Sequence, residues 1–137
     1  MIDELIDDLK SDEGWSPFAY QDHLGYWTIG YGFLVDAEKG VGLPEHIAEG
    51  WLRFAAESRY DELIDRAPWI EAQPEDVQRA LGNLCYQIGV GGVLKFKKML
   101  AALQAGDRQK AADEGLDSTW AKQTPARAKR VTDLIRG

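Results

Sequence analysis

The feature that most constrains the fold of this chain is one strand-like stretch, Pro17–Val35, in a sequence whose other segments carry a helical pattern. Within this stretch FAYQ predicts a first strand, DHLG a turn ending on Gly25, and YWTIGYGFLV the return strands. Gly30 and Gly32 interrupt the return and indicate a bend, a bulge, or a place where a group must approach the backbone closely. We therefore expect a small antiparallel sheet in a predominantly helical α+β protein.

Apolar residues at helical spacing predict helices on both sides of this sheet. Pro44 opens the longest helix and Pro68 ends it, because proline suits the first turn of a helix and disrupts its interior. GVGG at 89–92 is expected to break the third helix, and Thr124 to cap the last one, with Pro125 in its first turn. The expected helices span residues 2–11, 44–67, 74–88, about 93–105, 107–115 and 124–135.

These patterns predict one domain with two lobes. A sheet lobe covers residues 12–43, a connecting helix covers 44–67, and a helical lobe covers 68–137 together with residues 1–11. A chain of 137 residues is long enough to bury a core of its own. The only cysteine, Cys85, excludes an intrachain disulfide, and its place in an apolar helical stripe predicts a buried, inert thiol.

The net charge of -7 is divided unevenly along the chain. Residues 1–80 hold 6 Lys/Arg against 18 Asp/Glu, whereas residues 81–137 hold 10 against 5. The division fits either a basic patch that faces an anionic polymer, or complementary lobes with solvated helix faces. The start, MIDELIDDLK, lacks the basic and apolar regions of a secretory signal, and no apolar stretch is long enough for stable membrane insertion.

Two carboxylates in the strand-like region suggest chemistry. Glu13 lies at the end of the first expected helix, just past residue 11, and Asp22 lies in the hairpin turn nine positions later. Hydrolysis of a glycosidic bond needs one carboxylic acid to protonate the leaving oxygen, and one carboxylate on the other side of the sugar that activates water or attacks the anomeric carbon. Spacing alone is weak evidence for such chemistry and favours two solvated surface acids, since most surface carboxylates are merely solvated.

The neighbouring residues resemble a known family. DEG, YQD and GYWTIGYG form one block, NLCYQIGVGGVLKF (83–96) a second, and WAKQTPARAKRV (120–131) a third. In this order they resemble the phage-type lysozymes (endolysins), the muramidases of glycoside hydrolase family 24. The resemblance implies a lysozyme-like two-lobed fold that needs no cofactor and no metal. It also implies inverting hydrolysis of the β-1,4 bond between N-acetylmuramic acid and N-acetylglucosamine, and hence lysis of the bacterial wall.

The family's catalytic group carries over by position. The resemblance implies that Glu13 is the general acid, that Asp22 positions or activates the attacking water, and that Thr28 holds this water together with Asp22. A threonine hydroxyl suits this task because it both donates and accepts hydrogen bonds. Inversion leaves room for the water between sugar and base, so we expect the two carboxyl groups to lie about 6.5–9.5 Å apart.

Residues implied to contact substrate have alternative explanations. Leu34, Tyr86 and Gln87 match positions that line the family's cleft, where Tyr86 stacks on a sugar and Gln87 bonds an N-acetyl group. Their alternatives are a hairpin core residue, a core aromatic residue and a solvated amide. Arg127 matches an arginine that reaches toward the catalytic glutamate and orients it, and Trp120 matches a buried packing tryptophan.

The sequence also departs from the family pattern. Phe33 stands where many relatives carry a histidine that forms a structural ion pair, and the loop 36–43 is shortened. His23 and His46 are solitary and lack the spacing of metal ligands. The basic run RAKRV fits a solvated helix face and does not indicate nucleic-acid binding in an acidic protein.

Two other functions remain open from the sequence. A lytic transglycosylase uses a single acid and no water, and a non-catalytic peptidoglycan-binding module uses neither. The intact Glu13, Asp22 and Thr28 set favours the hydrolase. For a hydrolase, the resemblance implies that the substrate is peptidoglycan and that the protein is a monomer. It also implies a location in the host cytoplasm until a separate holin gives access to the wall.

Overall fold

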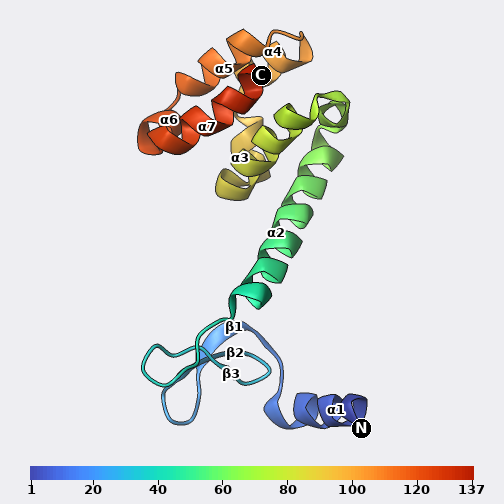
Figure 1. Ribbon diagram of the computed structural model, residues 1–137, viewed down its shortest axis with the longest axis vertical. Coiled ribbons are helices and arrows are strands. Elements are labelled where there is room, and N and C mark those ends of the chain that lie inside the picture. Colours follow the sequence, from blue (N-terminus) through green and yellow to red (C-terminus); the bar gives the residue numbers. More distant parts are fainter. The chain divides into compact units, whose positions relative to one another are not determined.

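The computed structural model describes all 137 residues and contains one small sheet between helices (Figure 1). The chain divides into two compact units, Met1–Gly50 and Trp51–Gly137, and the division falls inside helix α2 (Glu45–Arg66). The first unit holds α1 (Ile2–Glu13), β1 (Ser16–Gln21), β2 (Trp27–Gly30) and β3 (Phe33–Leu34). The second holds η1 (Pro68–Ala72), α3 (Glu75–Leu94), α4 (Lys97–Gln104), α5 (Arg108–Leu116), α6 (Thr119–Gln123) and α7 (Pro125–Arg136). The predicted α+β class, mostly helical, is confirmed.

The sheet is an antiparallel meander in the order β1-β2-β3. Tyr20 pairs with Thr28 and Ser16 with Gly30, so the register is irregular on β1 between Ser16 and Tyr20. Pro17 is tolerated there because β1 is an edge strand, where a missing N–H costs little. The bend expected at the glycines is present, since Gly30 and Gly32 both have positive φ.

The first unit buries very little of itself. Thr28 is its only buried residue, at 4% exposure. Helix α1 has no buried residue, and its apolar side chains Leu5, Ile6 and Leu9 are each more than 40% exposed. The expectation that residues 1–11 pack with the helical lobe concerns how the two units meet, and it stays a prediction.

The second unit carries the hydrophobic core. Its largest fully buried apolar side chains come from α2, η1, α3, α4 and α7, and they include Leu63, Ile70, Leu81, Leu84, Met99, Leu103 and Ile135. Cys85 is buried among them, as predicted, and burial is the main cause that raises the pKa of its thiol. The predicted break at GVGG is confirmed at Gly89, whose φ of 78° and ψ of 169° kink α3.

Two local expectations were incomplete or wrong. The short helix α6 and the turn of 3-10 helix η1 were not expected, because five residues carry no clear periodicity. Thr124 does stand before the first residue of α7, but its side chain makes no capping hydrogen bond. Its hydroxyl donates instead to the carbonyl oxygen of Trp120 in α6, at 3.1 Å.

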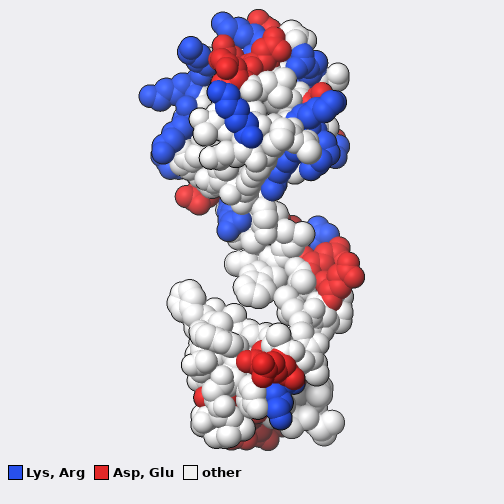
Figure 2. Space-filling view, turned by 90° about the vertical axis from the view of Figure 1, so that its left-hand side faces the viewer, with Lys and Arg blue, Asp and Glu red and all other residues white.

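Charge differs between the two units. The first unit has two Lys/Arg against eleven Asp/Glu, and the second has fourteen against twelve. On the face shown in Figure 2, lysine and arginine side chains are spread widely over the second unit, with acidic ones between them. None of the helices is both long enough and apolar enough to cross a membrane.

Candidate active site

Asp22 organises the hairpin turn between β1 and β2. Its Oδ1 accepts hydrogen bonds from the backbone N–H groups of Leu24 and Tyr26, each at 2.9 Å. Its own N–H donates to the carbonyl of Tyr26 at 2.8 Å, and Gly25 closes the turn with a φ of 85°. The other carboxylate oxygen, Oδ2, accepts no hydrogen bond from this unit. The half-buried Asp22 is therefore fixed by one oxygen and leaves the second available.

Thr28 lies on β2 opposite Leu34 of β3, so two predicted site residues are paired in the sheet. The Thr28 hydroxyl donates to the carbonyl of Tyr26 at 3.1 Å. Because Tyr26 also donates its N–H to Asp22, one residue of the turn links both polar side chains. The structure thus holds Asp22 and Thr28 in one hydrogen-bonded turn.

The start of β2 is held by a residue that the sequence analysis did not single out. Asp36 Oδ2 accepts from the N–H of Trp27 at 3.2 Å, and Oδ1 accepts from the N–H of Glu38 at 2.9 Å. These two backbone hydrogen bonds hold the pKa of Asp36 below its usual value, and the bond from Glu38 has the larger effect. Asp36 therefore ties the loop after β3 to the strand that carries Thr28.

Glu13 is the last residue of α1, which runs two residues beyond the expected end at residue 11, and its side chain is exposed. Its carboxyl lies against Gly32, in the turn between β2 and β3, which brings α1 close to the sheet. A hollow of about 300 Å³ opens beside it, lined also by Lys10 and Tyr31. The ring of Tyr31 packs against Trp15 at a tilt of 45°, with centroids 5.1 Å apart. The acid is thus exposed, next to aromatic surface and without an acidic neighbour in the hollow.

The predicted substrate residues of the second unit lie on α3. Tyr86 is 37% exposed, and the guanidinium of Arg59 covers its ring at 4.7 Å from the centroid. Arg59 also donates to the carbonyl oxygen of Tyr86 at 3.0 Å. Tyr86 is therefore not a core aromatic residue, and no sequence pattern indicated Arg59 as its neighbour.

Gln87 and Arg127 are each held by a partner in the second unit. Gln87 Oε1 accepts from the indole N–H of Trp120 at 2.9 Å, so Gln87 is not a freely solvated amide. Trp120 is 7% exposed, as the prediction of a buried tryptophan requires. Arg127 donates through Nε to the side chain of Asn83 at 2.9 Å. Its predicted approach to the glutamate joins residues of different units and stays a prediction.

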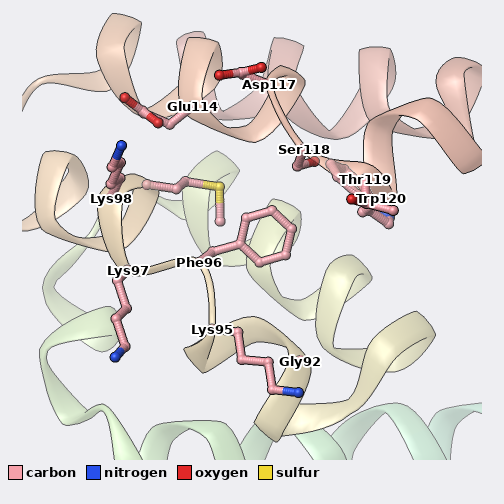
Figure 3. Close-up of a pocket in the computed structure, with 11 residues that line it drawn as sticks. Gly92, Lys95, Phe96, Lys97, Lys98, Glu114, Asp117, Ser118, Thr119 and Trp120 are labelled. Atoms are coloured by element: carbon pink, nitrogen blue, oxygen red, sulfur yellow. The ribbon is translucent and has the colours of Figure 1, made fainter.

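A larger hollow of about 590 Å³ lies in the second unit beside Trp120 (Figure 3). Phe96 projects into the middle of it and meets the ring of Trp120 edge-on, with centroids 6.0 Å apart. Lysines from the Phe96 side and carboxylates from the α5 side border it: Lys95, Lys97, Lys98, Glu114 and Asp117. The hollow is therefore lined by two aromatic rings, Phe96 and Trp120, and bordered by charges of both signs.

The mostly helical fold with its small sheet agrees with a lysozyme-type glycosidase, and the comparison with known families indicates the same class. The family model for phage lysozyme matches residues 10–136, and the chain belongs to this family of peptidoglycan hydrolases. It is 36% identical, over 152 residues, to the pre-baseplate central spike protein Gp5 of Enterobacteria phage T4. That match covers 93% of this chain and 26% of Gp5, so the chain spans about a quarter of that relative.

Two further relatives match along nearly their whole length. They are the probable T4-type lysozymes 1 and 2 of Dictyostelium discoideum, each 29% identical to this chain. The matches cover 98% of this chain and 95% of each relative. The resemblance to phage-type lysozymes is thereby confirmed, whereas the roles of individual side chains stay predictions.

Proposed function

We propose that this chain hydrolyses the β-1,4 bond between N-acetylmuramic acid and N-acetylglucosamine in peptidoglycan, with inversion, and so lyses bacterial cells. Glu13 is the general acid, Asp22 the general base, and Thr28 the residue that orients water. The observation that carries the proposal is the division of the Asp22 carboxylate. Oδ1 is fixed by two backbone N–H groups, whereas Oδ2 is left to accept a proton.

The hydrogen bonds of the turn also fix which way a water must face. The only proton of the Thr28 hydroxyl is committed to the carbonyl of Tyr26, so its oxygen is left as an acceptor. A water that donates one hydrogen to Thr28 and the other to Asp22 Oδ2 keeps a lone pair free for the anomeric carbon. This is the orientation that an inverting attack needs.

Protons balance across the proposed step. As the water oxygen bonds to the anomeric carbon, the water gives one proton to Asp22. The bond from the anomeric carbon to the bridging oxygen breaks, and Glu13 gives its proton to that oxygen. The attack requires the carboxyl groups to be separated by about 6.5–9.5 Å, enough for one water beside the sugar.

The second unit supplies the proposed contacts with substrate. One face of the Tyr86 ring carries Arg59, and its exposed part is available for a sugar ring. Since Gln87 Oε1 is bonded to Trp120, its amide N–H groups are the part left to donate to an N-acetyl carbonyl. Leu34 contributes apolar surface and Arg127 orients the glutamate.

The enzyme acts as a monomer and depends on a separate holin for access to the wall.

The test compares wild type with Glu13→Gln in a turbidity assay on purified peptidoglycan. Loss of the acid is expected to slow clearing by about 10²–10⁴-fold, the usual contribution of a general acid. Glu38→Gln, which neutralises an exposed acid of the same unit, serves as the matched control. Equal clearing by wild type and Glu13→Gln removes Glu13 from the mechanism.

Analysis of the products separates the remaining alternatives. Hydrolysis of the proposed bond gives reducing N-acetylmuramic acid ends, and inversion gives them first as the α anomer. Products with 1,6-anhydro ends identify a lytic transglycosylase instead. Binding to the wall without any new ends identifies a non-catalytic binding module.

A further inference from the structure

The carboxyl of Glu13 lies so close to Gly32 that a side chain at position 32 would overlap it. A Cβ placed on Gly32 overlaps Glu13 Oε2, lies 3.0 Å from Cδ and lies 3.4 Å from Cβ of the same glutamate. Gly32 also has a φ of 71°, a conformation that residues with a side chain rarely adopt. The space that a side chain at position 32 would take is therefore filled by the carboxyl of Glu13, the proposed general acid.

The other positive-φ glycines of the first unit do not have such a contact. Gly14, Gly25 and Gly42 also have positive φ, yet a Cβ on any of them meets nothing within 4 Å. A Cβ on Gly30 meets only the ring of Trp15, at an ordinary 3.9 Å. Positive φ explains all five glycines, but the space taken by a catalytic carboxyl distinguishes Gly32.

We propose that Gly32 is a positioning residue for Glu13, an inference that rests on the proposed role of this glutamate as general acid. The missing side chain lets the carboxyl lie against the turn between β2 and β3, on the sheet that carries Asp22 and Thr28. The sequence indicated that some group approaches the backbone at these glycines. The group that does so at Gly32 is the enzyme's own acid.

A methyl group at this position is expected to move the acid rather than unfold the protein. The overlapped atom is the end of a flexible, exposed side chain, which can rotate away at little cost. Proton transfer, however, depends on the place of that atom, and a misplacement of about 1 Å can cost about 100-fold in rate. Beyond the strain that any side chain meets at positive φ, the effect of Gly32→Ala should therefore appear in kcat and not in stability.

The experiment pairs Gly32→Ala with Gly42→Ala, which carries the same positive-φ strain away from the acid. On solubilised peptidoglycan we expect Gly32→Ala to lower kcat about 100-fold. KM and sedimentation with insoluble wall should stay within about threefold of wild type, since uniform binding is intact. Gly42→Ala should match wild type in kcat, and both variants should show the same shift in thermal unfolding.

Measuring Gly32→Ala in the Glu13→Asp variant tests whether Gly32 acts through Glu13. In Glu13→Asp the carboxyl is one methylene shorter and withdrawn from Gly32, although a weaker acid function remains. Adding Gly32→Ala to this variant should cost about threefold or less, because the two positions act as a unit. A full 100-fold loss in that background, or equal losses from Gly32→Ala and Gly42→Ala in the wild type, overturns the inference.

The same measurements separate this inference from the proposed function. If Glu13→Gln keeps wild-type activity, the general acid is misassigned and the proposed function fails with it. If Glu13→Gln is inactive while Gly32→Ala has a wild-type kcat, the acid is correct and only the positioning role of Gly32 is wrong.

Discussion

Substitutions at Asp22 can separate its structural role from its proposed catalytic role, because the two roles use different oxygens. Oδ1 accepts the hydrogen bonds of the turn, and Oδ2 is the proposed base. In Asp22→Asn the side-chain oxygen can still accept from Leu24 and Tyr26, while Oδ2 becomes an amide that takes no proton. In Asp22→Ala both hydrogen bonds are lost. The two variants should therefore differ in stability and agree in lost activity.

The size of the difference follows from the two hydrogen bonds. One of them is exposed and the other partly buried, and each is expected to contribute about 0.5–1.5 kcal/mol. Asp22→Ala should thus lose about 1–3 kcal/mol of unfolding free energy, or roughly 4–10 °C in Tm for a chain of this size. Asp22→Asn should lose less than about 1 kcal/mol. Both should lower kcat by about 10²–10⁴-fold, as expected for a missing general base.

The assay is thermal unfolding by circular dichroism beside release of reducing ends from peptidoglycan. Wild-type activity in Asp22→Asn would refute the proposed base. If Asp22→Asn unfolds as readily as Asp22→Ala, the turn needs the negative charge itself, and the reasoning from separate oxygens is wrong.

Two further predictions concern the second unit. The Arg108 guanidinium, 2.6 Å from Asp76, holds the pKa of Asp76 below its usual value. This stabilisation is complete above the unfolded pKa of about 4 and is lost as the pH falls through the lower pKa of the folded state, so the Tm advantage of wild type over Asp76→Asn should shrink as the solution is acidified. Trp120→Phe releases Gln87, and we expect a several-fold higher KM and a loss of about 1 kcal/mol in urea unfolding. Trp69→Phe, a partly buried tryptophan without a side-chain hydrogen bond, is the control, and an equal change in KM would contradict a role for Gln87.

Most elements of the fold were predictable because their signals are local. Pro44, Pro68 and Gly89 act on the backbone of their own neighbourhood, and the structure places a helix start, a helix end and a kink where they stand. Thr124 shows the limit of such signals. Its type and position predicted a capping bond, but a carbonyl from the unexpected helix α6 competed for the hydroxyl.

The candidate site was predictable as a set of residues and not as a set of contacts. The order of carboxylates, threonine and glycines indicated the family, but no pattern states that Asp22 uses one oxygen for its turn. Nor does any pattern place Arg59 over Tyr86, because these residues are 27 positions apart on different helices. Contacts of this kind depend on packing, which the sequence specifies only through the whole fold.

The near absence of buried residues around the site changes how sequence variation in this chain should be interpreted. In the second unit an intolerant position can simply reflect packing, since Leu84 or Met99 cannot shrink without leaving a cavity. In the first unit almost every side chain reaches solvent, and Thr28 is the one exception. A position between Met1 and Gly50 that rejects substitution therefore does so mainly for backbone geometry, contact with the rest of the molecule or chemistry. Mutational scanning of those fifty residues should therefore report on these three causes rather than on packing within the unit.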